Sequence, residues 1–591
     1  MHRSLLLVPA LLLLPIGAVS GQEIVPPKEG FTTGPPGYSI PAKPGTARTP
    51  VSRPRAGASA APDGSDIQAN QDSTSAQNET SFSVNPMDPD NWVGVANDYR
   101  FGSVQTGWYT TLDGGQNWTT GTFGIAPGFS FSGDPCVSFD VNGTVHIVAM
   151  MYWGPGGSGV WHWTSTDGGL NWTGGFEIDR NSANDKPQVG SDYSNGPHRG
   201  DVTTAWDRFG FSSSDIYAST WSAGSWSGPL KVNDSAVDDT IAPDVAYGAN
   251  SVLYIGWADR GSFDIFVDKS MNGGASYGND VLVSSYSQVP SPIPGSPFRM
   301  FDIFAIAADW TDGPHSGNVY LAYHTWSNSS PSNANIRCAT STNLGASWTT
   351  NLVNAADTTQ ADQVMPGVVV DSKGNVNVSF YDRRLDPNND LLWTWVARSS
   401  DGGQSWQEHP VSDTGWDPSP TEFGGTFIGD YIDVDAYDGL VFPFWCDGRS
   451  GSQEVYTDGV NLDFYADVDS LSAATGGSVQ LSLRIGPNFG GHDYIVVGSA
   501  SGTSPGTLTG TGVLVPLNQD AFTALTIAQA NSSMFQNTLG TLDAQGAADA
   551  VLDTQGPLNP ALVGNLYHFA TVVDPSAPSM ATQPLGILIL P

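Results

Sequence analysis

Pairs of aspartate and arginine recur along the chain and could do chemistry. Each pair follows a short apolar run that predicts a strand. A guanidinium binds a carboxylate through parallel N–H donors, and two nearby carboxyl groups can serve as acid and base on a glycosidic bond. The pairs are Asp98-Tyr-Arg100, Asp207-Arg208, Asp259-Arg260, Asp382-Arg383-Arg384 and Asp447-Gly-Arg449.

Two interpretations of these pairs stay open. In the first, each pair is structural and bridges neighbouring repeats, because one ligand does not need five copies of a motif. In the second, a subset forms a basin that binds or cleaves a ligand, with better candidates among the residues that break the repeat: Arg299, Tyr381, Arg384 and Tyr431. A structural cation such as calcium is a third alternative, although no metal-ligand spacing supports it, and no other cofactor is expected.

Composition and motifs exclude several other classes of function. The chain has 58 acidic and 22 basic residues, a net charge of −36, which repels nucleic acid and anionic membranes. It has no nucleotide-binding loop and no histidine cluster. No stretch after the N-terminus has the ~20 apolar residues of a membrane span. We expect a monomer without a nucleic-acid partner.

An eight-residue pattern indicates which elements position these side chains. A hydroxyl residue is followed by Asp or Asn, then Gly, then an aromatic residue, as in Thr111-Leu-Asp113-Gly-Gly115-Gln-Asn-Trp118. Asp-Gly and Asn-Gly favour tight hairpins, and the aromatic residue returns into the sheet, so we interpret this Asp box as structural. Its key residues are Asp113 and Trp118, Asp167 and Trp172, Asn272 and Tyr277, Asn343 and Trp348, and Asp401 and Trp406.

The spacing of the boxes predicts an all-β fold, a β-propeller from 78 to 463. Seven four-stranded units fit this length, with the box between the third and fourth strands, and six remain an alternative. The strand ends alternate between two faces. The Asp–Arg pairs and the starts of the inner strands should therefore share the face opposite the boxes, where propellers usually bind ligands.

The boxes, together with Asn184-Asp185-Lys186-Pro187, Phe380-Tyr381-Asp382-Arg383 and Phe427-Ile428-Gly429-Asp430-Tyr431, make the chain resemble the Asp-box (BNR-repeat) sialidase superfamily and bacterial secreted sialidase-like proteins. The resemblance implies a tyrosine nucleophile assisted by a glutamate, an aspartate as acid and base, and three arginines that hold the sugar carboxylate. The implied catalytic residues are Tyr431, Glu422 and Asp134. The candidate substrate-binding residues are Arg100, Arg208, Arg260, Arg299, Tyr381, Asp382, Arg383, Arg384, Arg449, Asp185 and Asp430.

The family's Arg-Ile-Pro motif is absent before the first box. Two functions therefore stay open: a sialidase-like propeller that binds and hydrolyses glycans, and a non-catalytic extracellular binding or adhesion scaffold on the same fold. In either case the expected partner is a glycan or glycoconjugate.

The two ends of the chain differ from the repeat region. Residues 1–20 have a positive start, an apolar stretch and small residues, which predict a signal peptide and a secreted or cell-surface protein. Residues 21–77 are rich in Pro, Gly and Ala, which predicts a disordered linker. Residues 464–591 contain alternating apolar runs separated by Gly- and Pro-rich turns, which predict a small β-sandwich.

Overall fold

The computed structural model describes residues 66–71, 75–153, 157–181, 183–210, 213–234, 239–327, 333–437 and 439–591. The expected signal peptide, 1–20, and most of the expected linker lie outside the described residues. No helix within these ranges is both long and apolar enough to cross a membrane.

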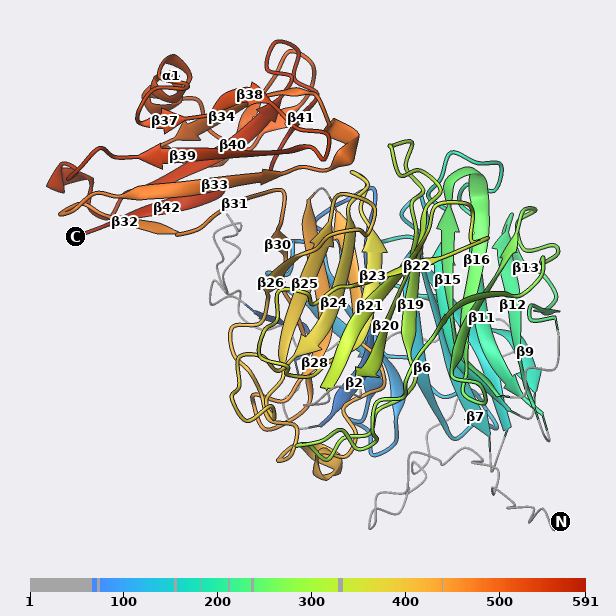
Figure 1. Cartoon of the computed structure of the whole chain (residues 1–591). Coiled ribbons are helices and arrows are strands. Elements are labelled where there is room, and N and C mark those ends of the chain that lie inside the picture. The colour runs from blue at the N-terminus through green and yellow to red at the C-terminus, as the bar shows by residue number, and fades with distance from the viewer. Residues whose placement is uncertain are drawn as a thin grey trace.

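Within these ranges, residues 67–461 form seven antiparallel sheets, the blades of a β-propeller (Figure 1). The first three blades each begin with an innermost strand, and the outer edge of the third is split into two short strands. Blade 1 is β2 (Gln77–Val84), β3 (Trp92–Asp98), β4 (Gln105–Thr111) and β5 (Thr119–Thr122); blade 2 is β6 (Phe131–Phe139), β7 (Val145–Trp153), β8 (Gly157–Ser165) and β9 (Thr173–Asn181); blade 3 is β10 (Asn184–Ser191), β11 (Val202–Phe209), β12 (Ser214–Ser222), β13 (Ser225–Trp226) and β14 (Leu230–Lys231).

The remaining blades repeat this order, and a short 3-10 turn, η1 (Ala249–Ser251), joins the first two strands of blade 4. Blade 4 is β15 (Thr240–Gly248), β16 (Val252–Asp259), β17 (Asp264–Ser270) and β18 (Val281–Ser285); blade 5 is β19 (Phe304–Ala308), β20 (Val319–Ser327), β21 (Asn333–Ser341) and β22 (Thr349–Leu352); blade 6 is β23 (Gln363–Val370), β24 (Val376–Asp382), β25 (Trp393–Ser399) and β26 (Gln407–Pro410); blade 7 has β27 (Asp433–Tyr437), β28 (Leu440–Asp447), β29 (Glu454–Thr457) and β30 (Val460–Asn461), preceded by η2 (Glu422–Gly425).

The N-terminal strand β1 (Ile67–Gln68) completes blade 7. Ile67 pairs with Thr457 and Gln68 with Tyr456 of β29, so the sheet order is β1-β29-β28-β27. The expected linker therefore extended too far, because part of the 21–77 range is a strand. The seven innermost strands contact one another in sequence and β27 contacts β2, which closes the ring.

Side chains of the inner strands join neighbouring blades around the ring. Asp433 accepts the backbone N–H of Phe82 at 2.9 Å and Asp435 accepts that of Val84 at 2.7 Å, which links blade 7 to blade 1. Asp244 accepts the N–H of Ile306 at 2.8 Å, between blades 4 and 5. These contacts explain why carboxyl groups lie in the central channel, since an inner strand has no sheet partner on its axial side.

The Asp boxes form the hairpins between the third and fourth strands, as expected. In the first box, Asp113 accepts a hydrogen bond from the backbone N–H of Asn117 at 2.8 Å, and Thr111 accepts one from Gly115 at 3.0 Å. The indole N–H of Trp118 closes the turn on the carbonyl of Gly115 at 3.1 Å. Gly115 has a φ of 82°, a conformation that favours glycine. The box is thus a self-contained folding unit.

The C-terminal domain packs two sheets around an apolar core. Among the described residues it contains one α-helix, α1 (Ala521–Ala528), capped by Asp520, which the sequence did not predict. One sheet has β31 (Phe464–Ala466), β33 (Ser478–Arg484), β39 (Ala547–Asp553) and β37 (Phe535–Gln536); the other has β32 (Ser470–Ser472), β42 (Leu585–Leu590), β40 (Leu566–Val573), β34 (Asp493–Ser499), β38 (Leu539–Thr541) and β41 (Met580–Ala581); β35 (Thr507–Leu508) pairs with β36 (Leu514–Val515), and η3 (Pro487–Phe489) and η4 (Pro560–Leu562) are short turns.

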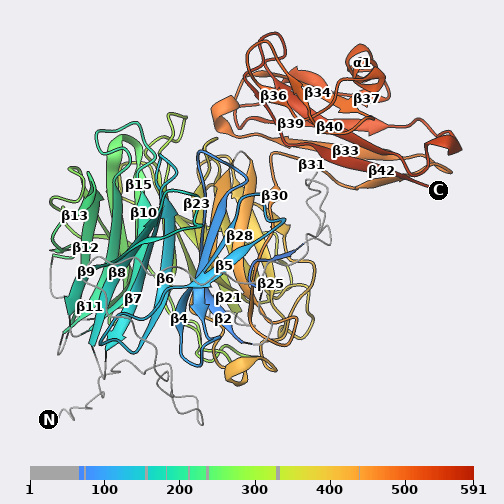
Figure 2. The same ribbon diagram turned by 180° about the vertical axis from the view of Figure 1, so that it is seen from behind.

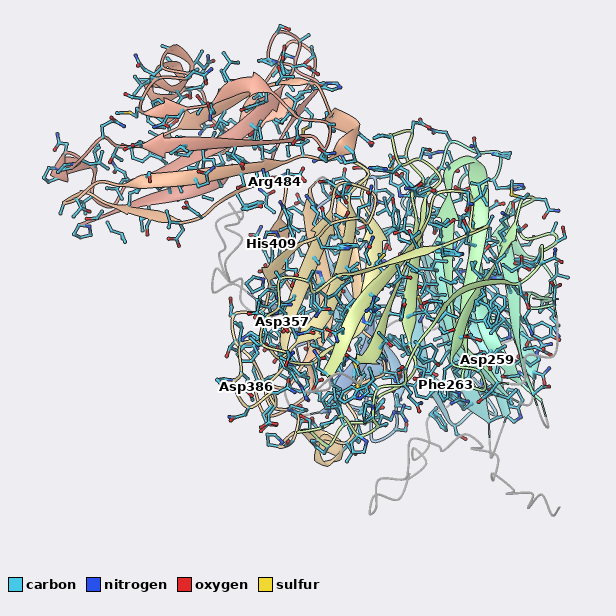
Figure 3. All side chains as sticks on the ribbon, in the orientation of Figure 1. Asp259, Phe263, Asp357, Asp386, His409 and Arg484 are labelled. Carbon is cyan, nitrogen blue, oxygen red and sulfur yellow. The ribbon has the colours of Figure 1, made fainter. Side chains whose placement is uncertain are left out.

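This domain lies at one end of the blades, as the views from the front and from behind both show (Figures 1 and 2). Loops between the second and third strands lie at the other end, where Figure 3 labels Asp259, Phe263 and Asp386. Because alternate turns of a blade fall on alternate faces, the Asp boxes lie on the face next to the C-terminal domain. We call this the Asp-box face and the other the opposite face.

Candidate functional site

Several inner strands begin at the opposite face with a β-bulge. The register of pairing shifts in blades 1, 2, 3, 4 and 6, and each bulge contains a residue with positive φ, which is uncommon outside glycine. In four of the five bulges the next residue is proline. The residues with positive φ are Glu79, Asp134, Lys186, Ala242 and Met365.

Side chains from four blades meet at this end of the channel. Lys186 of blade 3 lies 2.8 Å from Asp430 of blade 7 and 4.0 Å from Glu79 of blade 1. Because these residues belong to separate blades, their side chains must point towards the axis. We call the group formed by Glu79, Asp134, Asp185, Lys186, Arg299 and Asp430 the axial cluster.

Three carboxyl groups of the axial cluster, those of Glu79, Asp134 and Asp185, lie close enough to shift one another's pKa. The hydroxyl of Tyr152 donates to Asp134 at 2.8 Å and contacts Asp185 at 3.4 Å. Burial, and then the charge of Asp134, raises the pKa of Glu79 well above its usual range and that of Asp185 to about 7. Burial also opposes ionisation of Asp134, but Lys186 and hydrogen bonds from its neighbours lower its pKa overall. The surroundings therefore favour the protonated form of Glu79 and the ionised form of its neighbour Asp134.

Asp430 binds both cations of the axial cluster. Arg299 donates to it from Nε at 2.9 Å and from Nη2 at 2.7 Å. Burial would raise the pKa of Asp430, but Lys186 and Arg299 lower it to about 2. The side chain of Arg299 is 44% exposed, and its guanidinium carbon lies 4.5 Å from the ring centre of Phe427 and 5.8 Å from that of Phe301. An oriented cation with aromatic neighbours therefore lies at the channel mouth.

Tyr431 lies in the axial cluster's wall, but Glu422 is engaged elsewhere. Glu422 accepts hydrogen bonds from the hydroxyl of Ser452 at 2.5 Å and from the N–H of Gln453 at 2.9 Å, within its own blade. The hydroxyl of Tyr431 is buried and has no hydrogen-bond partner among the described residues. Burial, followed by the charge of Glu79, raises the pKa of Tyr431. This environment opposes formation of a phenolate nucleophile.

The repeated arginines mostly close their own loops. Arg100, Arg384 and Arg449 each bind the aspartate two residues earlier, at 2.6 Å. Arg260 binds Asp239 at 2.8 Å. The expected bridge between adjacent blades is found for Arg208, whose Nη2 lies 2.6 Å from Asp179 of blade 2. The expectation that every Asp–Arg pair bridges two blades was wrong, because an arginine two residues after an aspartate can bind it within one turn.

Tyr381 and Arg383, two further candidates, are completely buried. Tyr381 donates its hydroxyl to the carbonyl of Cys446 at 2.5 Å. Arg383 lies 3.3 Å from Asp362 and donates to Ser296 at 2.6 Å. Of the predicted arginines in the described part of the chain, Arg299 alone joins the axial cluster, so a three-arginine clamp does not form there.

The sequence predicted that Asp134, Asp185, Asp430 and Tyr431, at the starts of inner strands, lie on the opposite face, and the structure places them there. Arg299 was predicted only as a ligand candidate, and Glu79 was missed. The available signal was positional. Glu79 occupies in blade 1 the bulge position that Asp134 and Lys186 occupy, each before proline, in blades 2 and 3. Over the described ranges no group of three or more His, Cys, Asp or Glu side chains is arranged to hold a metal ion.

No protein-family model matches the chain, and no curated protein matches it. Among solved structures it is similar to a protein of unknown function from Dyadobacter fermentans, at 15% identity and a TM-score of 0.37, over 54% of this chain and 93% of that one. A Hadza microbial sialidase matches at 13% identity and a TM-score of 0.39, over 66% of each chain. A mutant Aleuria aurantia lectin with α-methyl-L-fucoside matches at 14% identity and a TM-score of 0.34, over 58% of this chain and 97% of that one.

Proposed function

We propose that this protein is an extracellular glycan-binding β-propeller that recognises its ligand on the opposite face, around Arg299. The supporting observation is the fixed geometry of that guanidinium, which two hydrogen bonds to Asp430 hold between Phe301 and Phe427 while 44% of its side chain stays exposed. Oriented N–H donors bind sugar hydroxyls or a carboxylate, and aromatic rings stack on the apolar face of a sugar. The secreted location rests on the pattern of residues 1–20.

A second candidate function is hydrolysis of a glycosidic bond, of the sialidase type. A protonated Glu79 beside an ionised Asp134 is an acid and a base with separated pKa values, which such chemistry requires. However, these two carboxyl groups are in hydrogen-bond contact with each other, and a sialidase-type reaction uses a tyrosine rather than a second carboxylate as nucleophile. The pKa of Tyr431 is also raised. Binding is therefore the function that the geometry supports better.

The two functions are tested on the same preparations of the full chain. Binding is measured on an array of neutral and sialylated glycans with the wild type and Arg299→Gln, and we expect the variant to lose at least about tenfold in affinity. Hydrolysis is measured with a fluorogenic sialoside and a panel of other fluorogenic glycosides. If the wild type hydrolyses a glycoside and Asp134→Asn does not, the protein is a glycoside hydrolase. Binding without turnover would establish the scaffold, and wild-type protein that does neither would refute both.

A further inference from the structure

A large cavity opens on the Asp-box face, away from the axial cluster. It has a volume of about 640 Å³ and is formed by turns between the first and second strands of blades 1, 2, 3, 5 and 6. Below it, a second cavity of about 490 Å³ continues along the channel. The two cavities share the lining residues Pro86, Tyr193, Trp310 and Ser372. The volume lies in the range of small-molecule sites.

Two aromatic rings form one wall of this cavity. Tyr193 comes from the β10–β11 turn and Trp310 from the β19–β20 turn, and their ring centres are 5.9 Å apart with planes inclined at 46°. The hydroxyl of Tyr193 donates to the carbonyl of Phe139 at 2.5 Å. Next to Trp310, Asp309 accepts the N–H of Thr311 at 2.8 Å. The ring of Tyr193 and the turn that carries Trp310 are therefore held in place before any ligand binds, which lowers the entropy cost of binding.

The polar lining is largely neutral. Asn195 donates its amide to Asp312 at 3.1 Å, which joins the turns of blades 3 and 5 across the cavity. Arg199 donates to the carbonyls of Tyr193 at 2.5 Å and Ser194 at 2.9 Å. The lining thus contains one cation and one anion together with amide and hydroxyl groups. This composition suits an uncharged ligand with many hydroxyls.

The C-terminal domain supplies part of the wall through Asn488. Its amide donates to the carbonyl of Ser372 at 3.3 Å, and its backbone N–H donates to that of Lys373 at 3.4 Å. A Cβ atom on Gly313 would lie 1.6 Å from the amide oxygen of Asn488. The asparagine therefore fits against this turn of blade 5 only because the turn carries glycine.

The junction between the two domains is buried and ionic. Asp463, between β30 and β31, forms ion pairs with Lys373 and with Arg398, the latter at 2.7 Å. Arg398 also lies 3.2 Å from Asp371 in the β23–β24 turn. All four side chains are at most 5% exposed. This junction anchors the start of the C-terminal domain to blade 6.

We propose that the cavity on the Asp-box face, lined by turns of the propeller and by Asn488, is a second saccharide-binding site. It is specific for a neutral mono- or disaccharide at the end of a glycan, and the C-terminal domain is anchored so that Asn488 completes its wall. Trp310 and Tyr193 stack on the apolar face of the sugar, and the amides and hydroxyls of the rim bind its hydroxyl groups. This site is independent of Arg299, which lies on the other face.

The test uses the full chain on an array of immobilised neutral glycans ending in galactose, glucose, mannose, fucose or N-acetylhexosamine. We expect Trp310→Ala to reduce binding of at least one glycan class by tenfold or more, and Asn488→Ala to reduce the same class severalfold. Arg299→Gln is the matched control on the other face and should leave that class unchanged.

Folding is checked by the Tm of each variant, and Trp310→Phe supplies a second, conservative substitution. If Trp310→Ala and Trp310→Phe both fold and bind every glycan as the wild type does, the inference is overturned. It is also overturned if Arg299→Gln removes all binding, an outcome that would still support the proposed function. Loss with Trp310→Ala while Arg299→Gln binds that class as the wild type does would support this site, and the array of neutral and sialylated glycans tests recognition at Arg299 separately.

Discussion

Arg299 and Asp430, 131 residues apart in the chain, are joined by two hydrogen bonds of 2.9 and 2.7 Å. The pair connects the segment before blade 5 to the start of blade 7 across the channel. Asp430 is completely buried and also binds Lys186 at 2.8 Å, whereas the side chain of Arg299 is 44% exposed. Loss of the Asp430 carboxylate should therefore lower the free energy of unfolding more than loss of the Arg299 guanidinium.

We expect Asp430→Asn to lower the free energy of unfolding by about 3–5 kcal/mol, because it leaves the buried ammonium of Lys186 without its nearest counter-charge. Arg299→Gln should cost about 1 kcal/mol or less, because solvent screens an exposed guanidinium and Lys186 still pairs with Asp430. Urea denaturation of both variants measures the difference. Equal losses in the two variants would contradict the ion-pair arrangement.

The dependence of stability on pH follows from the buried carboxyl groups. Burial raises the pKa values of Asp185, Asp244 and Asp435 to about 7 each. A carboxyl group whose pKa is raised on folding contributes stability that is complete below its unfolded value, near 4, and lost as the pH rises through 7. The pKa of Asp430 is lowered to about 2, so this carboxylate contributes stability that is lost only as the pH falls below about 4.

We therefore expect the Tm to be highest near pH 4–5 and to fall between pH 5 and pH 8, as followed by thermal denaturation in buffers of equal ionic strength. Asp185→Asn removes one of the titrating groups and should flatten this decline. A Tm that rises steadily from pH 5 to pH 8 would show that these carboxyl groups are ionised in the folded protein.

The variant Tyr431→Phe tests whether Tyr431 has a structural role or acts as a nucleophile. The hydroxyl is buried without a partner among the described residues, so its removal should change the free energy of unfolding by less than about 1 kcal/mol, in either direction. If the protein hydrolyses a glycoside through this oxygen, kcat must collapse in the variant while the Tm is kept. Full retention of any measured hydrolysis would exclude Tyr431 as nucleophile.

The parts of the fold that the sequence predicted are those encoded by local chemistry. The turn around Asp113 needs only the hydroxyl, carboxylate, glycine and aromatic groups of eight consecutive residues, so its pattern is visible in the chain. The position of Trp118 and its equivalents then follows, and with it the period of the blades and the two faces, although the sequence left both seven and six blades open. The Asp–Arg pairs were visible for the same reason, although their partners were only partly predicted.

The axial cluster was harder to predict because it depends on ring closure. Glu79 acquires its charged neighbours, Asp134 and Lys186, only when blades 1, 2 and 3 close around the same channel and a bulge turns its side chain inwards. Similarly, Asn488 contacts Gly374 only through the junction at Asp463. Long-range contacts of this kind leave little trace in a single sequence, and a strand of two residues such as β1 is too short to show periodicity.

We expect the short strand β1 to stabilise blade 7. A chain beginning at residue 66 retains β1, whereas one beginning at residue 75 lacks it. The shorter chain loses the hydrogen bonds of Ala69 and Asn70 with Val455, at 2.8 and 2.9 Å, and the ion pair of Asp66 with Arg449 at 2.5 Å. It also exposes β29 as an open sheet edge, which favours association with other chains.

We expect the chain beginning at residue 75 to lose on the order of 3 kcal/mol of unfolding free energy, at about 1 kcal/mol for each lost contact, and to aggregate at a lower temperature. The chain beginning at residue 66 is the matched control, because it keeps β1 and the described contacts of residues 66–70 with blade 7. Urea denaturation and light scattering on heating compare the three. If the two shortened chains were equally stable, β1 would not stabilise blade 7, because its removal must expose β29 at the outer edge of that blade.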